Sequence, residues 1–90
     1  MAQIIKSNGQ TTEVTPKNGT DFSLEELQTI VGGWIEIVNL RDGRLLCLDE
    51  EGKLKGKDFN TRATYILQAA MPTHDFVVGD VLVCDAEEIK

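Results

Sequence analysis

A cluster of basic residues interrupts an otherwise acidic sequence. Residues 52–62 hold four positively charged side chains and one negatively charged one, whereas the rest of the chain carries five positive and fourteen negative ones. A positive region on a negatively charged protein creates a local field that attracts anions. The four cations are Lys53, Lys55, Lys57 and Arg62, and the chemistry they favour is the binding of a small anionic, nucleotide-type ligand.

Asn60 and Thr61 lie at the start of a predicted helix within this basic segment. Asn is a preferred N-cap residue, and the first turn of a helix offers free backbone amides and a positive dipole to an anion. Arg62 could add a bidentate contact to a phosphate. The alternative is a solvated loop in which the lysines offset the neighbouring carboxylates at positions 49–51. The hypothetical ligand site therefore comprises Lys53, Lys55, Lys57, Asn60, Thr61 and Arg62.

Residues able to perform catalysis or bind a metal do not form a recognisable pattern. Glu36 and the acidic run 49–51 belong to separate segments, and a divalent oxygen site needs several converging carboxylates. His74 has no nucleophile beside it in the sequence, and Cys47 and Cys84 lack the spacing of a zinc site. We expect no catalytic residue, no metal site and no cofactor, and we expect both cysteines to be reduced and buried.

Trp34 is the single tryptophan and follows Gly32 and Gly33 directly. The two glycines are typical of a helix C-cap rather than a phosphate loop, because carbonyls and not amides are free at that end of a helix. Trp34 is a possible recognition aromatic. Since aromatic side chains usually bury large areas, we expect Trp34 to lie in a core or an interface.

Two helices and several strands are predicted to position these residues. Ser23 and Glu26 form a capping box before a helix over Leu24–Val31, and a second helix is predicted over Thr61–Ala70, ahead of Pro72. The β-rich segments are a hairpin within residues 1–16, a strand starting at 34, a central strand at 44–48, and a closing pair at 75–78 and 81–84. The tail at 86–90 is expected to fray.

These elements predict one α+β domain over residues 1–90, with two short helices packed on a mainly antiparallel sheet. The chain is 90 residues long and carries a net charge of −6, which disfavours direct binding to nucleic acid or to an anionic membrane. We find no signal peptide pattern and expect a cytoplasmic location. A domain this small buries little surface, so a homo-oligomer is possible.

Several short segments between about residues 27 and 85 occur in the order of a known family. They include Gly32–Gly33 with the following aromatic strand, the acidic turn at 49–54, Asn60 with Ala63 and Thr64, and the segment 78–83. In these features the chain resembles an uncharacterised family of small phage and mobile-element proteins, a domain of unknown function. The N-terminal hairpin is not an obvious part of that pattern. The resemblance implies an accessory protein with no reaction attached and supplies no catalytic residues.

Two functions fit this sequence. The first is a non-catalytic counter-defence protein that binds and sequesters a small anionic host signal. The second is an acidic inhibitor or nucleic-acid mimic that binds a basic groove of a host defence complex, which the net charge favours. The first function predicts that substitutions in the basic segment weaken binding. The second predicts that substitutions of acidic residues such as Glu50, Glu51 and Glu87 weaken it.

Overall fold

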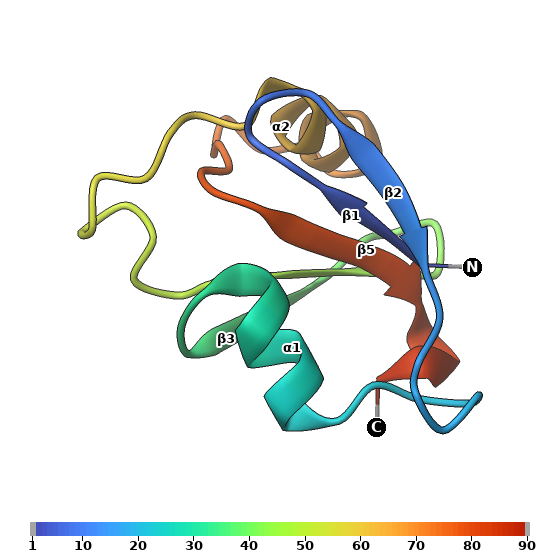
Figure 1. The fold of residues 1–90 in the computed structure, drawn as a ribbon. Helices are drawn as coiled ribbons and strands as arrows, with labels where there is room; N and C mark the ends of the chain where they lie inside the picture. The colour runs from blue at the N-terminus through green and yellow to red at the C-terminus, as the bar shows by residue number, and fades with distance from the viewer. Residues whose placement is uncertain (1, 90) are drawn as a thin grey trace.

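A five-stranded antiparallel sheet forms the centre of the molecule, with one helix on each face (Figure 1). The computed structural model describes residues 2–89. In spatial order the strands are β2 (Thr11–Val14), β1 (Ala2–Ile5), β5 (Val81–Asp85), β4 (Arg44–Asp49) and β3 (Ile35–Asn39). The helices are α1 (Leu24–Val31) and α2 (Thr61–Ala70), and a 3-10 helix, η1, covers Ala86–Glu88. The predicted α+β class is confirmed.

The sheet separates two hydrophobic cores. The core under α1 contains Leu27, Val31 and Leu82 together with both cysteines. The core under α2 contains Leu46, Leu67 and Val83. Because successive residues of a strand point to opposite faces, β4 and β5 contribute to both cores. This accounts for their nearly continuous apolar sequences and confirms β4 as a central strand.

Both predicted helices are confirmed with the bounds expected from sequence. Ser23 and Glu26 form the predicted capping box, in which the Ser23 hydroxyl accepts from the Glu26 amide at 3.1 Å. Gly32 ends α1 in the left-handed conformation, with φ of 81°, which glycine adopts without a steric penalty. The Asn60 side chain accepts from the Ala63 amide and begins α2.

The predicted strand at residues 75–78 is wrong. β5 already pairs with β1 on one side and β4 on the other, so the sheet has no free edge beside it. The segment instead lies against α2, where the Val77 amide donates to the Thr64 hydroxyl at 2.9 Å. A single bridge between Phe59 and Val78 is its only β contact among residues 2–89.

The two ends of the described chain are integrated into the fold. β1 and β2 form the hairpin predicted within residues 1–16, and β1 also pairs with β5. The tail, which was expected to fray, forms η1 and contacts the fold: the Phe22 amide donates to the Glu88 carbonyl at 2.7 Å, and Ile89 packs against the core under α1. Lys90 lies outside the described residues. Across residues 2–89, we find no helix with the length and hydrophobicity to cross a bilayer.

Candidate functional site

Two lysines of the basic segment converge on one buried carboxylate. The Nζ atoms of Lys55 and Lys57 each lie 2.8 Å from Oδ2 of Asp49, whose side chain is almost fully buried at the end of β4. Asp49 was expected in a solvent-exposed turn, and that expectation is wrong. We refer to Asp49, Lys55 and Lys57 as the lysine latch, because they tie the loop after β4 to the sheet.

The lysine latch also closes the end of α1. Lys57 Nζ donates to the Val31 carbonyl at 2.6 Å, and Lys55 Nζ donates to the Gly32 carbonyl at 3.4 Å. The last turn of α1 contains no basic residue of its own. The loop lysines therefore supply the positive charge that the carbonyl end of a helix dipole favours.

The protonation state of Asp49 follows from this geometry. Burial raises the pKa of a carboxyl, but the hydrogen bonds from Lys55 and Lys57 outweigh it and lower the pKa of Asp49 to about 2. The Glu51 amide adds a hydrogen bond of 2.9 Å to Oδ1. Asp49 is thus a buried, charged structural group, and its two lysine partners reach it from the surface, with side chains 41% and 23% exposed.

Gly33 passes directly beneath the lysine latch. A Cβ atom at this position would lie 2.5 Å from Lys55 Nζ and 2.7 Å from Asp49 Oδ2. Gly32 supplies the positive φ of the cap, and Gly33 supplies the space for the ion pair. The adjacent glycines therefore have two different structural functions, and neither is phosphate binding.

Asn60 is buried and joins three parts of the chain. Its Nδ2 donates to the Ile5 carbonyl at 3.0 Å and to the Gly79 carbonyl at 2.8 Å, while its Oδ1 accepts from Ala63. Every hydrogen-bonding atom of the side chain amide is used, so none remains available to a ligand. The helix-capping part of the prediction is confirmed.

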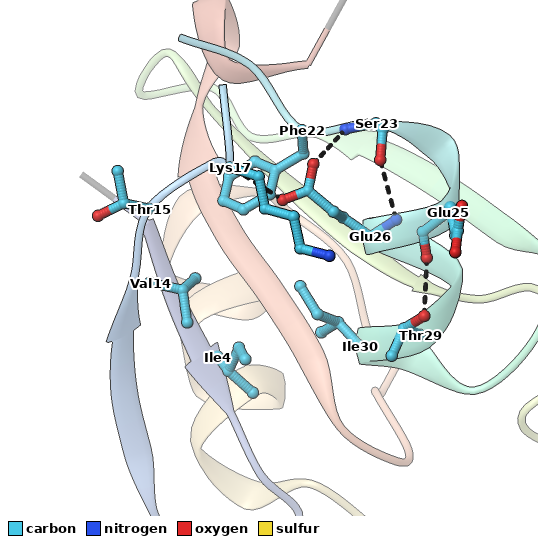
Figure 2. A pocket seen from close by; sticks show the side chains of 10 residues that line it. All are labelled: Ile4, Val14, Thr15, Lys17, Phe22, Ser23, Glu25, Glu26, Thr29 and Ile30. Atoms are coloured by element: carbon cyan, nitrogen blue, oxygen red, sulfur yellow. Dashed lines mark hydrogen bonds between the residues drawn. The ribbon is translucent and has the colours of Figure 1, made fainter. Parts of the chain in front are cut away.

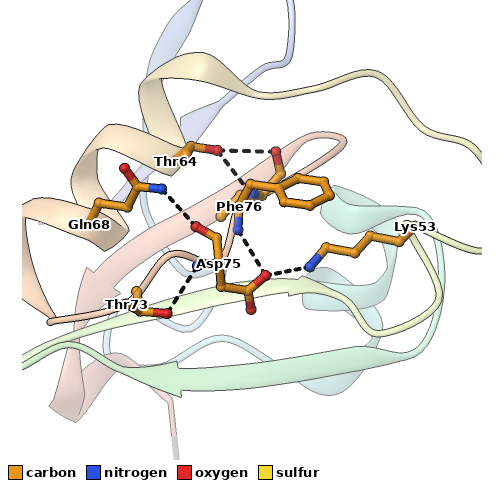
Figure 3. A network of polar contacts seen from close by, with 7 residues as sticks. Lys53, Thr64, Gln68, Thr73, Asp75 and Phe76 are labelled. Carbon is orange, nitrogen blue, oxygen red and sulfur yellow. Dashed lines mark hydrogen bonds and ion pairs between the residues drawn. The ribbon is translucent and has the colours of Figure 1, made fainter.

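Lys53 lies apart from the other two lysines, on the α2 side of the sheet (Figure 3). Its Nζ forms an ion pair of 2.5 Å with Asp75 and stands 4.2 Å from the centre of the Phe76 ring. Asp75 also accepts from the Phe76 amide, and the Asp75 carbonyl accepts from Gln68 of α2. Lys53 therefore belongs to a network that holds the segment after α2.

Thr61 and Arg62 remain exposed at the start of α2. They line a shallow groove of about 440 Å³ with Gly9 and Tyr65, and the Tyr65 side chain is 73% exposed. Within residues 2–89, Arg62 forms no ion pair. The six residues of the predicted ligand site are thus divided among four places, and only the side chains of Thr61 and Arg62 form no hydrogen bond or ion pair within residues 2–89.

Trp34 is 62% exposed, so the expectation that it lies in the core of this chain is wrong, while a position in an interface stays a prediction. It stands just before β3, the strand at the edge of the sheet, so no further strand covers it. Its carbonyl accepts from the Glu50 amide at 2.9 Å. Trp34 is therefore a surface aromatic beside an edge strand.

Glu36 on β3 and Glu50, which follows β4 directly, are both exposed. The sequence placed both in a doubtful carboxylate site and named Glu50 in the acidic surface of the inhibitor hypothesis, but it did not bring the two together. Neither forms an ion pair among the residues that the structure describes. With Lys53, Asp75 and Phe76 they surround a groove of about 220 Å³ whose apolar lining includes Val38 and Leu48. The signal that could have identified this surface is Glu36 within an otherwise apolar strand.

A third groove lies between α1 and the N-terminal hairpin (Figure 2). It has a volume of about 410 Å³, and its apolar floor comes from Ile4, Val14, Phe22 and Ile30. Its rim carries both Lys17 and the carboxylates of Glu25 and Glu26, so it favours neither charge. The Glu26 carboxylate accepts hydrogen bonds from the Lys17 and Ser23 backbone amides.

The remaining nucleophiles and metal-ligating groups are dispersed. Cys47 and Cys84 are buried free thiols, and burial is the main factor that raises their pKa values to about 12 and about 11. Within residues 2–89 no three His, Cys, Asp or Glu side chains are grouped so as to hold a metal ion.

Comparison with known proteins identifies the family. The model described as a domain of unknown function, DUF3846, matches residues 1–90. This chain belongs to the DUF3846 family. No curated protein and no solved structure matches it significantly.

The extent of the DUF3846 match corrects the expected range of the family pattern. The match includes the N-terminal hairpin, which the resemblance had left out. The structure gives the reason, because β1 lies inside the sheet between β2 and β5. A DUF3846 domain without this hairpin would expose one side of β5 and part of both cores.

Proposed function

We propose that this chain is a non-catalytic protein-binding domain that acts through its acidic surface. The observation that carries the proposal is the internal pairing of Lys53, Lys55 and Lys57 with Asp75 and Asp49. These lysines are the main positive feature of the sequence, and each forms an ion pair with a carboxylate of the same chain. Glu36 and Glu50, on and beside β3, form no direct ion pair with these lysines within residues 2–89.

An acidic surface of this kind complements a positively charged groove on another protein. Complementary fields accelerate association and select the partner, and their effect weakens with added salt. The resemblance to small phage and mobile-element proteins supports a role in which binding blocks a host defence complex. Such a complex would present to this chain the basic surface with which it holds nucleic acid.

Salt-dependent capture tests this function. The tagged protein is incubated with an extract of the organism that encodes it, at low and at high salt, and retained proteins are identified by mass spectrometry. We expect Glu50→Lys with Glu51→Lys to abolish capture of a partner. We expect Glu50→Lys alone to weaken capture more than the matched single reversal Glu13→Lys on β2. A partner retained equally at high salt and by the double reversal would contradict an acidic binding surface.

A second candidate function is the binding of a nucleotide-type ligand at the start of α2. The exposed pair Thr61 and Arg62, with Tyr65 one turn later, favours it. Arg62 would contact a phosphate, and the Tyr65 ring would stack on a base. The groove is shallow, so a ligand here would lie on the surface and bind through these contacts.

A thermal-shift series with nucleotides tests this candidate. A bound nucleotide would raise the melting temperature, and Arg62→Ala would remove the increase. Arg41→Ala, an exposed arginine in the turn between β3 and β4, is the matched control and would keep it. No shift with any nucleotide would exclude this site. Lys55 and Lys57 are unsuitable for the test because their replacement disturbs the lysine latch.

A further inference from the structure

β3 presents an unpaired row of backbone groups at the edge of the sheet. The Glu50 amide donates to the Trp34 carbonyl, and the Leu40 amide donates to the Arg44 carbonyl. Alternate residues of an antiparallel strand bond to the same neighbour, so Trp34, Glu36, Val38 and Leu40 face β4. The N–H and C=O groups of the intervening residues 35, 37 and 39 therefore point away from the sheet.

The side chains of β3 give this edge a two-sided character. On the α1 face, Ile35 and Ile37 are half-buried and pack against the core. On the α2 face, Glu36 is exposed and unpaired, next to Val38. A strand added here would meet apolar side chains on one face and a carboxylate on the other.

The groove beside Glu36 fits one long side chain rather than a small-molecule ligand. Its volume of about 220 Å³ is below the usual range of about 300–1,000 Å³ for small-molecule sites. Glu36 and Glu50 lie on its wall without a cation. At its other end, the Lys53 ammonium already rests on the Phe76 ring beside Asp75 (Figure 3). Carboxylates and an aromatic ring, which both bind cations, thus line the groove. The chain's own Lys53 ammonium already occupies one end of it.

We infer that β3 is the docking edge for an extended, basic segment of a partner protein, which adds to the sheet as a sixth strand. The inference rests on the proposed protein-binding function and names its surface and the chemistry of its partner. The segment carries Lys or Arg at alternate positions, so that a cation enters the groove between Glu36 and Glu50. Its intervening side chains are apolar and cover Ile35 and Ile37. The main-chain hydrogen bonds supply affinity, and the alternate side chains supply specificity.

A synthetic heptapeptide of alternating Val and Lys is the probe. Trp34 is the single tryptophan of the chain and precedes β3 directly, so its fluorescence reports on this edge. We expect a saturable change on titration with the peptide. Glu36→Lys weakens binding about tenfold or more, since it replaces a charge-assisted contact with repulsion. Glu13→Lys makes the same charge change on β2 at the opposite edge and leaves the affinity within about twofold.

Two further peptides separate strand addition from charge attraction. One is N-methylated at its odd-numbered residues and the other at its even-numbered residues. Each retains the charges of the probe, but one of them cannot donate its hydrogen bonds to β3, and we expect that peptide to bind at least about tenfold more weakly. Equal binding of all three peptides would overturn the inference. Equal weakening by Glu36→Lys and Glu13→Lys would also overturn it, because binding would then follow net charge alone.

The outcomes also distinguish this inference from the proposed function. If no peptide binds while the salt-sensitive partner is still captured from extract, the docking edge is wrong and the protein-binding function stands. If neither binds, both fail. A concentration-dependent dimer in sedimentation that Glu36→Lys disrupts, with no peptide binding, would assign the edge to a second copy and overturn the inference.

Discussion

At the residue scale, Asp49 contributes to stability in a way that its sequence neighbours Glu50 and Glu51 do not. Its side chain is 1% exposed, and its carboxylate bonds to two ammonium groups that also bind the end of α1. Asp49→Asn keeps the shape but removes the charge. Because hydrogen bonds to charged groups contribute about 1.5–3 kcal/mol, we expect the free energy of unfolding to fall by about that amount in denaturant melts.

Asp42→Asn is the matched control for Asp49→Asn. Asp42 also pairs with a cation, Arg44, at 2.6 Å, but both side chains are about 40% exposed. An exposed pair contributes about 0.2–1 kcal/mol. Equal destabilisation by the two variants would contradict a special role for the lysine latch.

The same carboxylate predicts how stability depends on pH. The pKa of Asp49 is lowered from 3.8 to about 2 in the folded protein. A lowered folded-state pKa stabilises the protein above the unfolded-state value, and this contribution is lost as the pH falls from about 4 to about 2. Melting temperatures measured across this interval are expected to fall more steeply for the parent than for Asp49→Asn. Parallel curves would show that Asp49 does not titrate in this way.

The exposure of Trp34 changes the loss of stability expected when its side chain is removed. A buried aromatic truncated to Ala costs about 3–5 kcal/mol, but Trp34 is 62% exposed. We expect Trp34→Ala to lower the free energy of unfolding by less than about 1 kcal/mol. Leu82→Ala, at a fully buried position, provides the comparison and is expected to cost about 2–5 kcal/mol. Similar losses for both variants would mean that the tryptophan ring is packed.

At the scale of elements, the loop after β4 and the end of α1 stabilise each other. Gly33→Ala would place a methyl group 2.7 Å from the buried Asp49 carboxylate, which cannot move as freely as the Lys55 ammonium. We expect a loss of about 1–3 kcal/mol in thermal or denaturant unfolding, as for other strained core substitutions. The loss arises from displacement of the lysine latch.

A double-mutant cycle checks that cause. Once Lys55→Ala has removed the ammonium, the methyl group added by Gly33→Ala no longer meets the Lys55 side chain. The double variant Gly33→Ala with Lys55→Ala should then be less destabilised than the sum of the single variants, by at least about 0.5 kcal/mol. Strict additivity would show that Gly33 acts independently of the ion pair.

At the scale of the whole molecule, both cores use the same strands. Leu46 and Cys47 of β4 face opposite cores, as do Leu82 and Val83 of β5. Losing either core therefore removes support from the other. We expect one cooperative unfolding transition, with coincident midpoints for Trp34 fluorescence and far-ultraviolet circular dichroism. Separated midpoints would show that the α1 and α2 sides unfold independently.

Local sequence patterns predicted the elements better than they predicted the site. The capping box at Ser23 and the Asn60 cap involve residues three positions apart, so both helices were predicted with their observed bounds. The lysine latch instead joins Lys57 to Val31, 26 residues away, and no local pattern indicates it. The segment at 75–78 was misassigned because its β-rich composition does not reveal that both sides of β5 are occupied.

The surface beside β3 was missed for a related reason. Charge counting finds a basic segment, but it cannot tell which cations are neutralised by distant partners such as Asp75. The exposure of Trp34 likewise depends on which strand forms the edge, and that is a property of strand order.

The position of β5 has a consequence for synthesis of the protein on the ribosome. The sheet joins β1 to β4 only through β5, and Gln3 pairs with Val83 across 80 residues of chain. Until residues 81–85 leave the exit tunnel, the hairpin of β1 and β2 and the pair β3–β4 lack the strand that unites them. Contacts between such distant parts of a chain form slowly. Because an isolated strand pair is at best marginally stable, the nascent chain completes its fold only after this last strand has emerged.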